Sequence, residues 1–157
     1  GTPFFIILRQ KWTLLQPKTR KALAQLGLAP VYSGDQQRPI LSGPEEQYQT
    51  THFLIHYTRS GKDAVPTKDA NGDGVPDYVA EAASVAEFVR QTEIDTLKWA
   101  QPPADHGEGG DQRYDIYFRD IPYYGYTQAS EPIGDNPHTS AVETAAAYSF
   151  LVLDNDY

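Results

Sequence analysis

The segment 69–77 constrains the fold of this chain more than any other part of the sequence. Oxygen-bearing side chains occupy loop positions 1, 3, 5 and 9, and glycine occupies position 6. A hard cation takes about six to eight oxygen ligands, so alternate residues of a tight turn must point inward while the glycine takes the sharp bend. The spacing predicts a calcium-binding loop of the EF-hand type, with the ligands Asp69, Asn71, Asp73, the Val75 carbonyl and Asp77.

The end of this loop departs from the EF-hand pattern. Position 12, where a bidentate glutamate normally completes the shell, is Ala80, and Glu81 follows one residue later. Three alternatives can complete the shell: Glu81 reaches back to the ion, water fills the position, or another segment donates a carboxylate. Asp63 is the nearest upstream candidate for such a carboxylate. The competing interpretation is an Asp/Asn/Gly turn followed by an aspartate that caps a helix. We expect calcium rather than magnesium, because magnesium demands a tighter octahedron and keeps several waters.

Length and composition favour one globular domain with long loops. The chain has 157 residues, 39% of them hydrophobic and 22% charged, with 12 prolines and 12 glycines. A chain of this size can bury a core without disulfides, and it has no cysteine to form them. We expect residues 1–50 to form a short helix at 17–26 and an extended linker, and residues 51–157 to form the calcium-loop domain, in one compact unit.

The charge balance argues against nucleic acid as a partner. The net charge is −8, and the basic residues Lys18, Arg20 and Lys21 fit the exposed face of the helix expected at 17–26. Nucleic-acid binding depends mainly on clustered lysine and arginine. The apolar run at 4–8 is too short for a signal peptide or a membrane span. Because the sequence starts without methionine, we expect a processed or partial product.

Hydrophobic patterning predicts an α+β fold, in which a small mixed sheet carries one long packed helix and long loops. Strands are expected at 51–58, 114–118 and 148–153, where β-branched and aromatic residues concentrate. The last of these is nearly all apolar, so we expect it to be central and covered on both faces. The stretch 120–139 is too polar and too proline-rich to form one element.

The long helix is expected at 77–100. An apolar stripe starts at Tyr78 and resumes one step out of phase at Ile94. We therefore expect a bend, or a change of packing partner, near Thr92.

Histidines are poor candidates for metal ligands here. His52 and His56 are four residues apart in a strand pattern, which places them about 13 Å apart on one face, too far to share an ion. We expect both to be structural strand residues. His106 and His138 lie in loops beside acidic residues, where solvated side chains are the expectation.

The chain contains no recognisable catalytic constellation. Neither a Gly-x-Ser-x-Gly elbow, a phosphate loop nor an HExxH motif occurs in the sequence. Asp154 and Asp156 follow the last strand, and without a third ligand in register we favour a polar strand exit over a second cation site.

Several segments resemble a group of secreted bacterial zinc metalloproteases of the zincin type. The matching segments cover roughly residues 50–157 and are 52–58, 61–65, 69–79, 124–127 and 153–157. The resemblance implies the upper part of a zincin catalytic domain, N-terminal to the HExxH helix that supplies the zinc ligands and the general base. Zinc is then a cofactor only where a C-terminal part supplies HExxH.

Two functions follow as hypotheses. The first is a calcium-stabilised N-terminal portion of an extracellular zinc metalloprotease, a hydrolase whose catalytic residues lie outside this chain and whose partner is its own C-terminal catalytic part. The second is a non-enzymatic, secreted calcium-binding module that assembles with other protein chains. The 11 tyrosines of the chain suit such an interface and suit a loop-covered core equally well.

Overall fold

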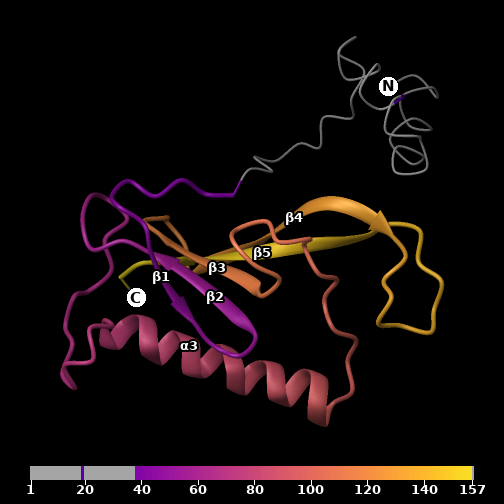
Figure 1. Ribbon diagram of the computed structural model, residues 1–157, viewed down its shortest axis with the longest axis horizontal. Coiled ribbons are helices and arrows are strands. Elements are labelled where there is room, and N and C mark those ends of the chain that lie inside the picture. The colour runs from indigo at the N-terminus through magenta and orange to yellow at the C-terminus, as the bar shows by residue number, and fades with distance from the viewer. Residues whose placement is uncertain (1–18, 20–37, 157) are drawn as a thin grey trace.

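A computed structural model of the chain describes Thr19 and residues 38–156 (Figure 1). The helix expected at 17–26, apart from Thr19, and the first part of the expected linker lie outside these residues. The strands are β1 (Glu46–Gln49), β2 (Phe53–Tyr57), β3 (Tyr114–Arg119), β4 (Gly125–Gly134) and β5 (Ala146–Asp154), and the helix α3 (Asp77–Arg90) continues into the π-helix η2 (Gln91–Thr96).

The described strands form one mixed sheet in the order β1-β2-β3-β5-β4. The inner strands β2, β3 and β5 are parallel neighbours, while β1 and β4 run antiparallel to their neighbours at the two edges. Parallel neighbours need a long crossover connection, and α3 supplies it between β2 and β3. The predicted α+β class, and the prediction that three named strands share one sheet with a long helix, are confirmed.

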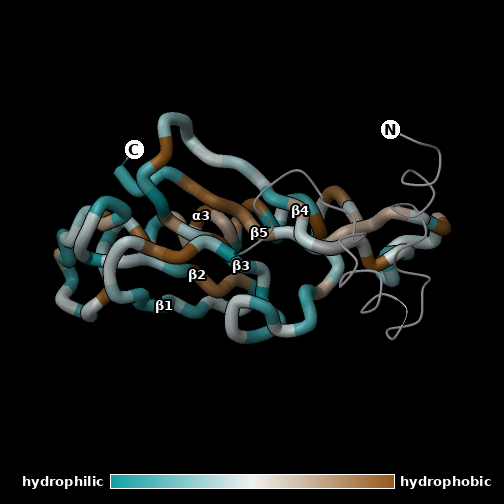
Figure 2. Tube along the Cα trace, turned by 90° about the horizontal axis from the view of Figure 1, so that it is seen from above, coloured by the Kyte–Doolittle hydropathy of each residue, from teal (hydrophilic) through white to brown (hydrophobic). Residues whose placement is uncertain are grey.

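The main core lies between the sheet and α3. Alternate residues of a strand face the same side, and one stripe of a helix does so as well. The buried residues that meet there come from β2, β3 and α3. They include Ile55, Tyr57, Val79, Ala83, Ile116 and Phe118. Figure 2 shows hydrophobic residues gathered along the central strands and the adjoining α3. This burial fixes α3, and with it the loop that precedes α3, against the sheet.

The long helix begins at Asp77, as predicted, but its geometry changes after Arg90. In the π-helical stretch, the Leu97 amide donates to the Thr92 carbonyl five residues back, at 2.9 Å. A π-turn holds one more residue than an α-turn, which accounts for the apolar stripe resuming one step out of phase. Residues 97–100, expected to be helical, are not. Within residues 38–156 this helix is not long and apolar enough to cross a membrane.

Two strands were not expected from the sequence. β1 lies in the stretch where the sequence predicts a linker, and β4 lies in the stretch 120–139, whose polar and proline-rich composition argues against one element. Both are edge strands, and an edge strand tolerates polar residues and even Pro132 because one of its sides is not hydrogen-bonded within the sheet. Their main stabilisation is backbone pairing, which hydrophobicity does not reveal.

β5 is an inner strand, as predicted, but it is not covered equally on both faces. Its residues Tyr148, Phe150 and Val152 are buried, whereas Leu151 and Leu153 on the other face are half-buried. These two leucines line an apolar groove between α3 and the sheet. The reason is the position of α3, which packs mainly against β2.

Candidate functional site

The loop 69–77 is closed at its two ends. The amide of Asp77 donates to the Lys68 carbonyl at 2.7 Å, and the amide of Ala70 donates to Asp77 Oδ1 at 3.0 Å. These bonds bring position 9 of the loop back beside its start. Because Asp77 is also the first residue of α3, the loop is tied directly to the packed helix.

Asp69 organises the first half of the loop. Its Oδ1 accepts the Gly72 amide at 2.8 Å, and its Oδ2 accepts the Gly74 amide at 2.9 Å. Both glycines have positive φ, 72° and 88°, a conformation that L residues rarely adopt. A Cβ atom at either position would meet no atom within 4 Å, so glycine serves the backbone conformation and not close packing.

Asn71 and Asp73 form the second half. Asn71 Nδ2 donates to Asp73 Oδ2 at 2.9 Å, Asn71 Oδ1 accepts the Asp73 amide at 3.0 Å, and Asp73 Oδ1 accepts the Val75 amide at 2.8 Å. A carboxylate oxygen that accepts one N–H keeps a further lone pair. The loop thus presents three carboxylates and one amide oxygen in a chemistry that suits a hard cation.

Little positive charge offsets these carboxylates. Lys68 Nζ lies 3.4 Å from Asp77 Oδ2 on a side chain that is 80% exposed, and the Arg59 guanidinium donates to the Gly74 carbonyl. No three acidic, cysteine or histidine side chains among the described residues are gathered into a ready-made metal-binding group. The Asn71 amide oxygen and the Val75 carbonyl, which the spacing adds to the carboxylates as ligands, stay predictions.

The two carboxylates considered for the last calcium ligand lie in different surroundings. Asp63 is buried, and its oxygens accept the amides of Ser42 and Asp120 at 2.8 and 3.1 Å. Burial alone raises its pKa, but these amides lower it overall. Both Asp63 oxygens are thus engaged by backbone amides outside the loop 69–77. Glu81 is exposed and lines the apolar groove beside α3, and its role as a ligand stays a prediction.

His56 lies at the centre of a second, buried group of charges. Its Nδ1 is 2.8 Å from Glu45 Oε1, its Nε2 is 2.8 Å from Asp115 Oδ1, and its ring stacks on Tyr117 at 4.1 Å. Two carboxylates on the two ring nitrogens require both nitrogens to donate, which is the imidazolium form. Burial lowers the pKa of His56, but the hydrogen bonds and charges of Asp115 and Glu45 raise it overall.

Arg38 extends this buried network to the loop before β3. Its guanidinium lies 2.5 Å from Asp105 Oδ2 and 2.9 Å from Asp115 Oδ2, the second contact without the alignment of a hydrogen bond. Burial, together with the neighbouring Asp115, raises the pKa of Asp105 to about 6. The Gly107 amide and the Arg38 charge lower this pKa, but by less. Inside the fold, the cations His56 and Arg38 therefore face the carboxylates of Glu45, Asp105 and Asp115.

His52, the other histidine of this segment, has a partner of its own. His52 Nδ1 is 2.6 Å from Glu87 Oε2 of α3, and the His52 amide donates to Glu87 Oε1 at 2.8 Å. Burial would raise the pKa of Glu87, but hydrogen bonds from Thr50 and His52 lower it to about 2. His52 and His56 thus have different carboxylate partners.

Asp154, the last residue of β5, and Asn155 after it make structural hydrogen bonds at this end of the sheet. Asp154 Oδ1 accepts the Ile121 amide at 3.0 Å, and Asn155 Nδ2 donates to the carbonyls of Lys62 and Ala64 at 3.3 and 2.7 Å. Both side chains are buried. They hold two loops at the end of the sheet.

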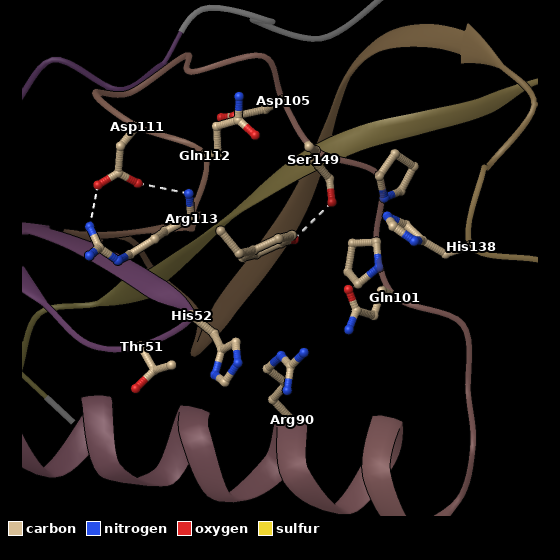
Figure 3. Close-up of a pocket in the computed structure, with 14 residues that line it drawn as sticks. Thr51, His52, Arg90, Gln101, Asp105, Asp111, Gln112, Arg113, His138 and Ser149 are labelled. Atoms are coloured by element: carbon tan, nitrogen blue, oxygen red, sulfur yellow. Dashed lines mark hydrogen bonds and ion pairs between the residues drawn. The ribbon is translucent and has the colours of Figure 1, made fainter.

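A polar pocket, which the sequence did not reveal, opens beside the end of α3 (Figure 3). It has a volume of about 490 Å³ and is lined from several distant segments, including His52, Arg90, Gln101, Tyr114, His138 and Ser149. Tyr114 Oη and Ser149 Oγ lie 2.8 Å apart at its wall. These residues share no sequence motif, and only the fold brings them together.

Comparison of the chain with protein-family models, with curated proteins and with solved structures gives no match in any of the three.

Proposed function

We propose that the chain is a calcium-stabilised part of an extracellular zinc metalloprotease, the portion that precedes its catalytic helix. The observation that carries the calcium part is the arrangement of the loop 69–77. Its carboxylates are organised by backbone amides, yet among the described residues their one ion pair is between Asp77 and the exposed Lys68. A bound calcium ion would supply the missing positive charge and hold the loop against the start of α3.

An extracellular location suits such a loop. Without a glutamate at position 12, the three loop carboxylates should bind calcium at about 10⁻⁴ to 10⁻³ M, the range of extracellular modules. Calcium at that level is found outside cells and not in the cytosol.

The protease part of the proposal is supported by the resemblance and by the order of the elements. A mixed sheet with one long helix, placed ahead of the missing HExxH helix, agrees with the expected upper part of a zincin domain. Zinc, held by that helix, would activate water for peptide hydrolysis. The residues of this chain would position the calcium loop and the sheet, and none of them replaces the HExxH glutamate.

The apolar groove beside α3 suits a protein partner. Val85 and Val89 of α3 are 55% and 42% exposed, and they line the groove with Leu151 and Leu153 of β5. An apolar face of this kind is typical of a surface that another protein segment covers. It supports a C-terminal catalytic part as the partner, and it supports the second candidate, a non-enzymatic module that assembles with other chains.

The coding sequence after Tyr157 separates the two candidates. The protease predicts an HExxH motif within a few tens of residues, and the module predicts none. We expect the longer chain to cleave peptides in a chelator-sensitive way and its HExxH Glu→Gln variant to be inactive. The present chain alone should cleave no peptide, with or without zinc. Chelator-sensitive cleavage by the present chain, free of contaminants, would contradict the proposal.

A further inference from the structure

Arg90 differs from the other described arginines. Of the five arginines among residues 38–156, four lie within 4 Å of a carboxylate, namely Arg38, Arg59, Arg113 and Arg119. Arg90 is half-buried, lies at the end of α3 and has no such partner in the described part of the chain. The chain has a net charge of −8, yet this half-buried guanidinium has no carboxylate partner among residues 38–156. It is therefore available to bind an anion.

Arg90 points into the polar pocket. Figure 3 shows it beside His52 at the floor of the pocket, with Gln101 and His138 on the opposite side. Arg90 presents a planar fork of N–H donors, and Gln101 carries two more amide donors. The hydroxyls of Tyr114 and Ser149, 2.8 Å apart, complete a wall that can donate as well. The pocket therefore offers several donors around one unpaired positive charge.

The carboxylates of the pocket are bound by other groups. Asp111 accepts both the amide and the guanidinium of Arg113, and Asp105 lies 2.5 Å from the Arg38 guanidinium. Neither is available to neutralise Arg90. The charge that remains open to a ligand in this pocket is positive.

We propose that this pocket binds a small oxyanion, a carboxylate or a phosphate, through a bidentate pair with Arg90. The volume of about 490 Å³ admits a small molecule with this group, and guanidinium forks match both carboxylate and phosphate oxygens. Gln101 and the Tyr114–Ser149 hydroxyls orient the ligand. The site is separate from the calcium loop and does not depend on the proposed protease function.

Two probes test the site and distinguish the two oxyanions. Succinate and inorganic phosphate are titrated separately into the ¹⁵N-labelled chain, without calcium and at constant ionic strength. We expect saturable shifts of the Gln101 side-chain amide and of the amides near Arg90, with a dissociation constant of about 1 mM for the preferred anion. Saturation by succinate alone identifies a carboxylate site, and saturation by phosphate alone identifies a phosphate site.

Arg90→Gln is the decisive variant and Arg59→Gln is its matched control. Arg59 is paired with Glu46 and lies outside the pocket. We expect Arg90→Gln to weaken binding by about tenfold or more and Arg59→Gln to leave it within about twofold. An unchanged melting temperature in Arg90→Gln shows that the variant is folded. The proposal is wrong if neither anion saturates the site below about 20 mM, or if Arg90→Gln binds as the wild type does.

Discussion

The buried network around His56 and the exposed loop 69–77 both gather carboxylates, but they neutralise them differently. In the network, Asp115 meets His56 at 2.8 Å and Arg38 at 2.9 Å, and all three side chains are largely removed from water. In the loop, the hydrogen bonds of Asp69 and Asp73 within the described part of the chain come from backbone amides and the Asn71 side chain. The network therefore receives its positive charge from the fold itself, whereas the loop carboxylates have little positive charge beside them among the described residues, which is why we propose a bound cation there.

The difference is between buried charges, which the fold must pair, and exposed charges, which water can solvate. A buried carboxylate without a partner is strongly destabilising, so the fold supplies its own cations where water is absent. An exposed carboxylate is solvated by water, so leaving it without a cation costs little folding free energy. By this criterion, Asp105 and Asp115 of the network are of the buried kind, and Asp73 of the loop 69–77 is of the exposed kind.

The largest effect should come from Asp115→Ala. The change leaves His56 and Arg38 buried without their shared partner, and breaking such a pair costs about 3–5 kcal/mol. The free energy of unfolding, measured by urea denaturation, should fall by this amount. Asp73→Ala without calcium is the control, and it should cost less than about 1 kcal/mol because the residue is exposed. Equal losses in the two variants would remove the distinction between the regions.

A matched pair of glycines sharpens the comparison. Gly109 and Gly74 have similar positive φ values, 84° and 88°, but a Cβ at Gly109 would lie 2.4 Å from Asp115 Oδ2, and one at Gly74 would meet nothing within 4 Å. Gly74→Ala should cost about 1–2 kcal/mol from backbone strain alone. Gly109→Ala should cost about 1–3 kcal/mol more, because it crowds the buried carboxylate. Denaturation of both variants in parallel measures the difference in their free energies of unfolding. Similar losses would show that Asp115 can move to accommodate the added Cβ without cost.

The buried network should make stability depend on pH above about pH 4. His56 has a raised pKa in the folded state, so its contribution is fully present below its unfolded value of about 6.5 and is lost as pH rises through the folded value. Stability should therefore decline above pH 6.5 by up to about 1.4 kcal/mol per pH unit. Asp105, raised to about 6, acts with the same sign between about pH 4 and 6.

His56→Gln is the variant that isolates the first of these two windows. Glutamine can still hydrogen-bond but does not titrate, so the decline above pH 6.5 should disappear. The groups that face His56 are Glu45, Gln47, Asp115 and Tyr117, with Arg38 and Asp105 beyond Asp115. Unfolding curves of wild type and variant from pH 5 to 9 test this, and an unchanged slope in the variant would assign the effect to another group.

The sequence revealed local features well and long-range ones poorly. Strands such as β2 and β3, the start of α3 and the phase shift near Thr92 follow from periodicity, which acts between near neighbours. β1 and β4 were missed because edge strands depend on pairing with distant partners.

The same distinction applies to the sites. The loop 69–77 is contiguous, so its ligand spacing is readable from the sequence, although the calcium itself stays a prediction. The salt bridge between Arg38 and Asp115 and the pocket around Arg90 join residues far apart in the chain. No spacing rule predicts such contacts, since they depend on the order of the strands in the sheet.

Calcium should give the smallest but most specific effect. At a calcium concentration about ten times the dissociation constant, binding to the folded state adds roughly 1.4 kcal/mol, which raises the melting temperature by a few degrees. Magnesium should raise the melting temperature much less, because it demands a tighter octahedron of ligands and keeps several of its waters. Differential scanning calorimetry with each ion measures this shift.

Asp73→Ala should abolish the calcium shift, because it removes one loop carboxylate and the acceptor of the Val75 amide. Asp105 is unsuitable as a control, since it is buried against Arg38 and its removal would disturb the core. Asp95→Ala is the better match, because Asp95 is exposed and lies outside the loop, so its calcium shift should equal that of the wild type. Equal calcium shifts in Asp73→Ala and Asp95→Ala would mean that the loop is only a turn, and that its exposed carboxylates are solvated surface charges without a bound cation.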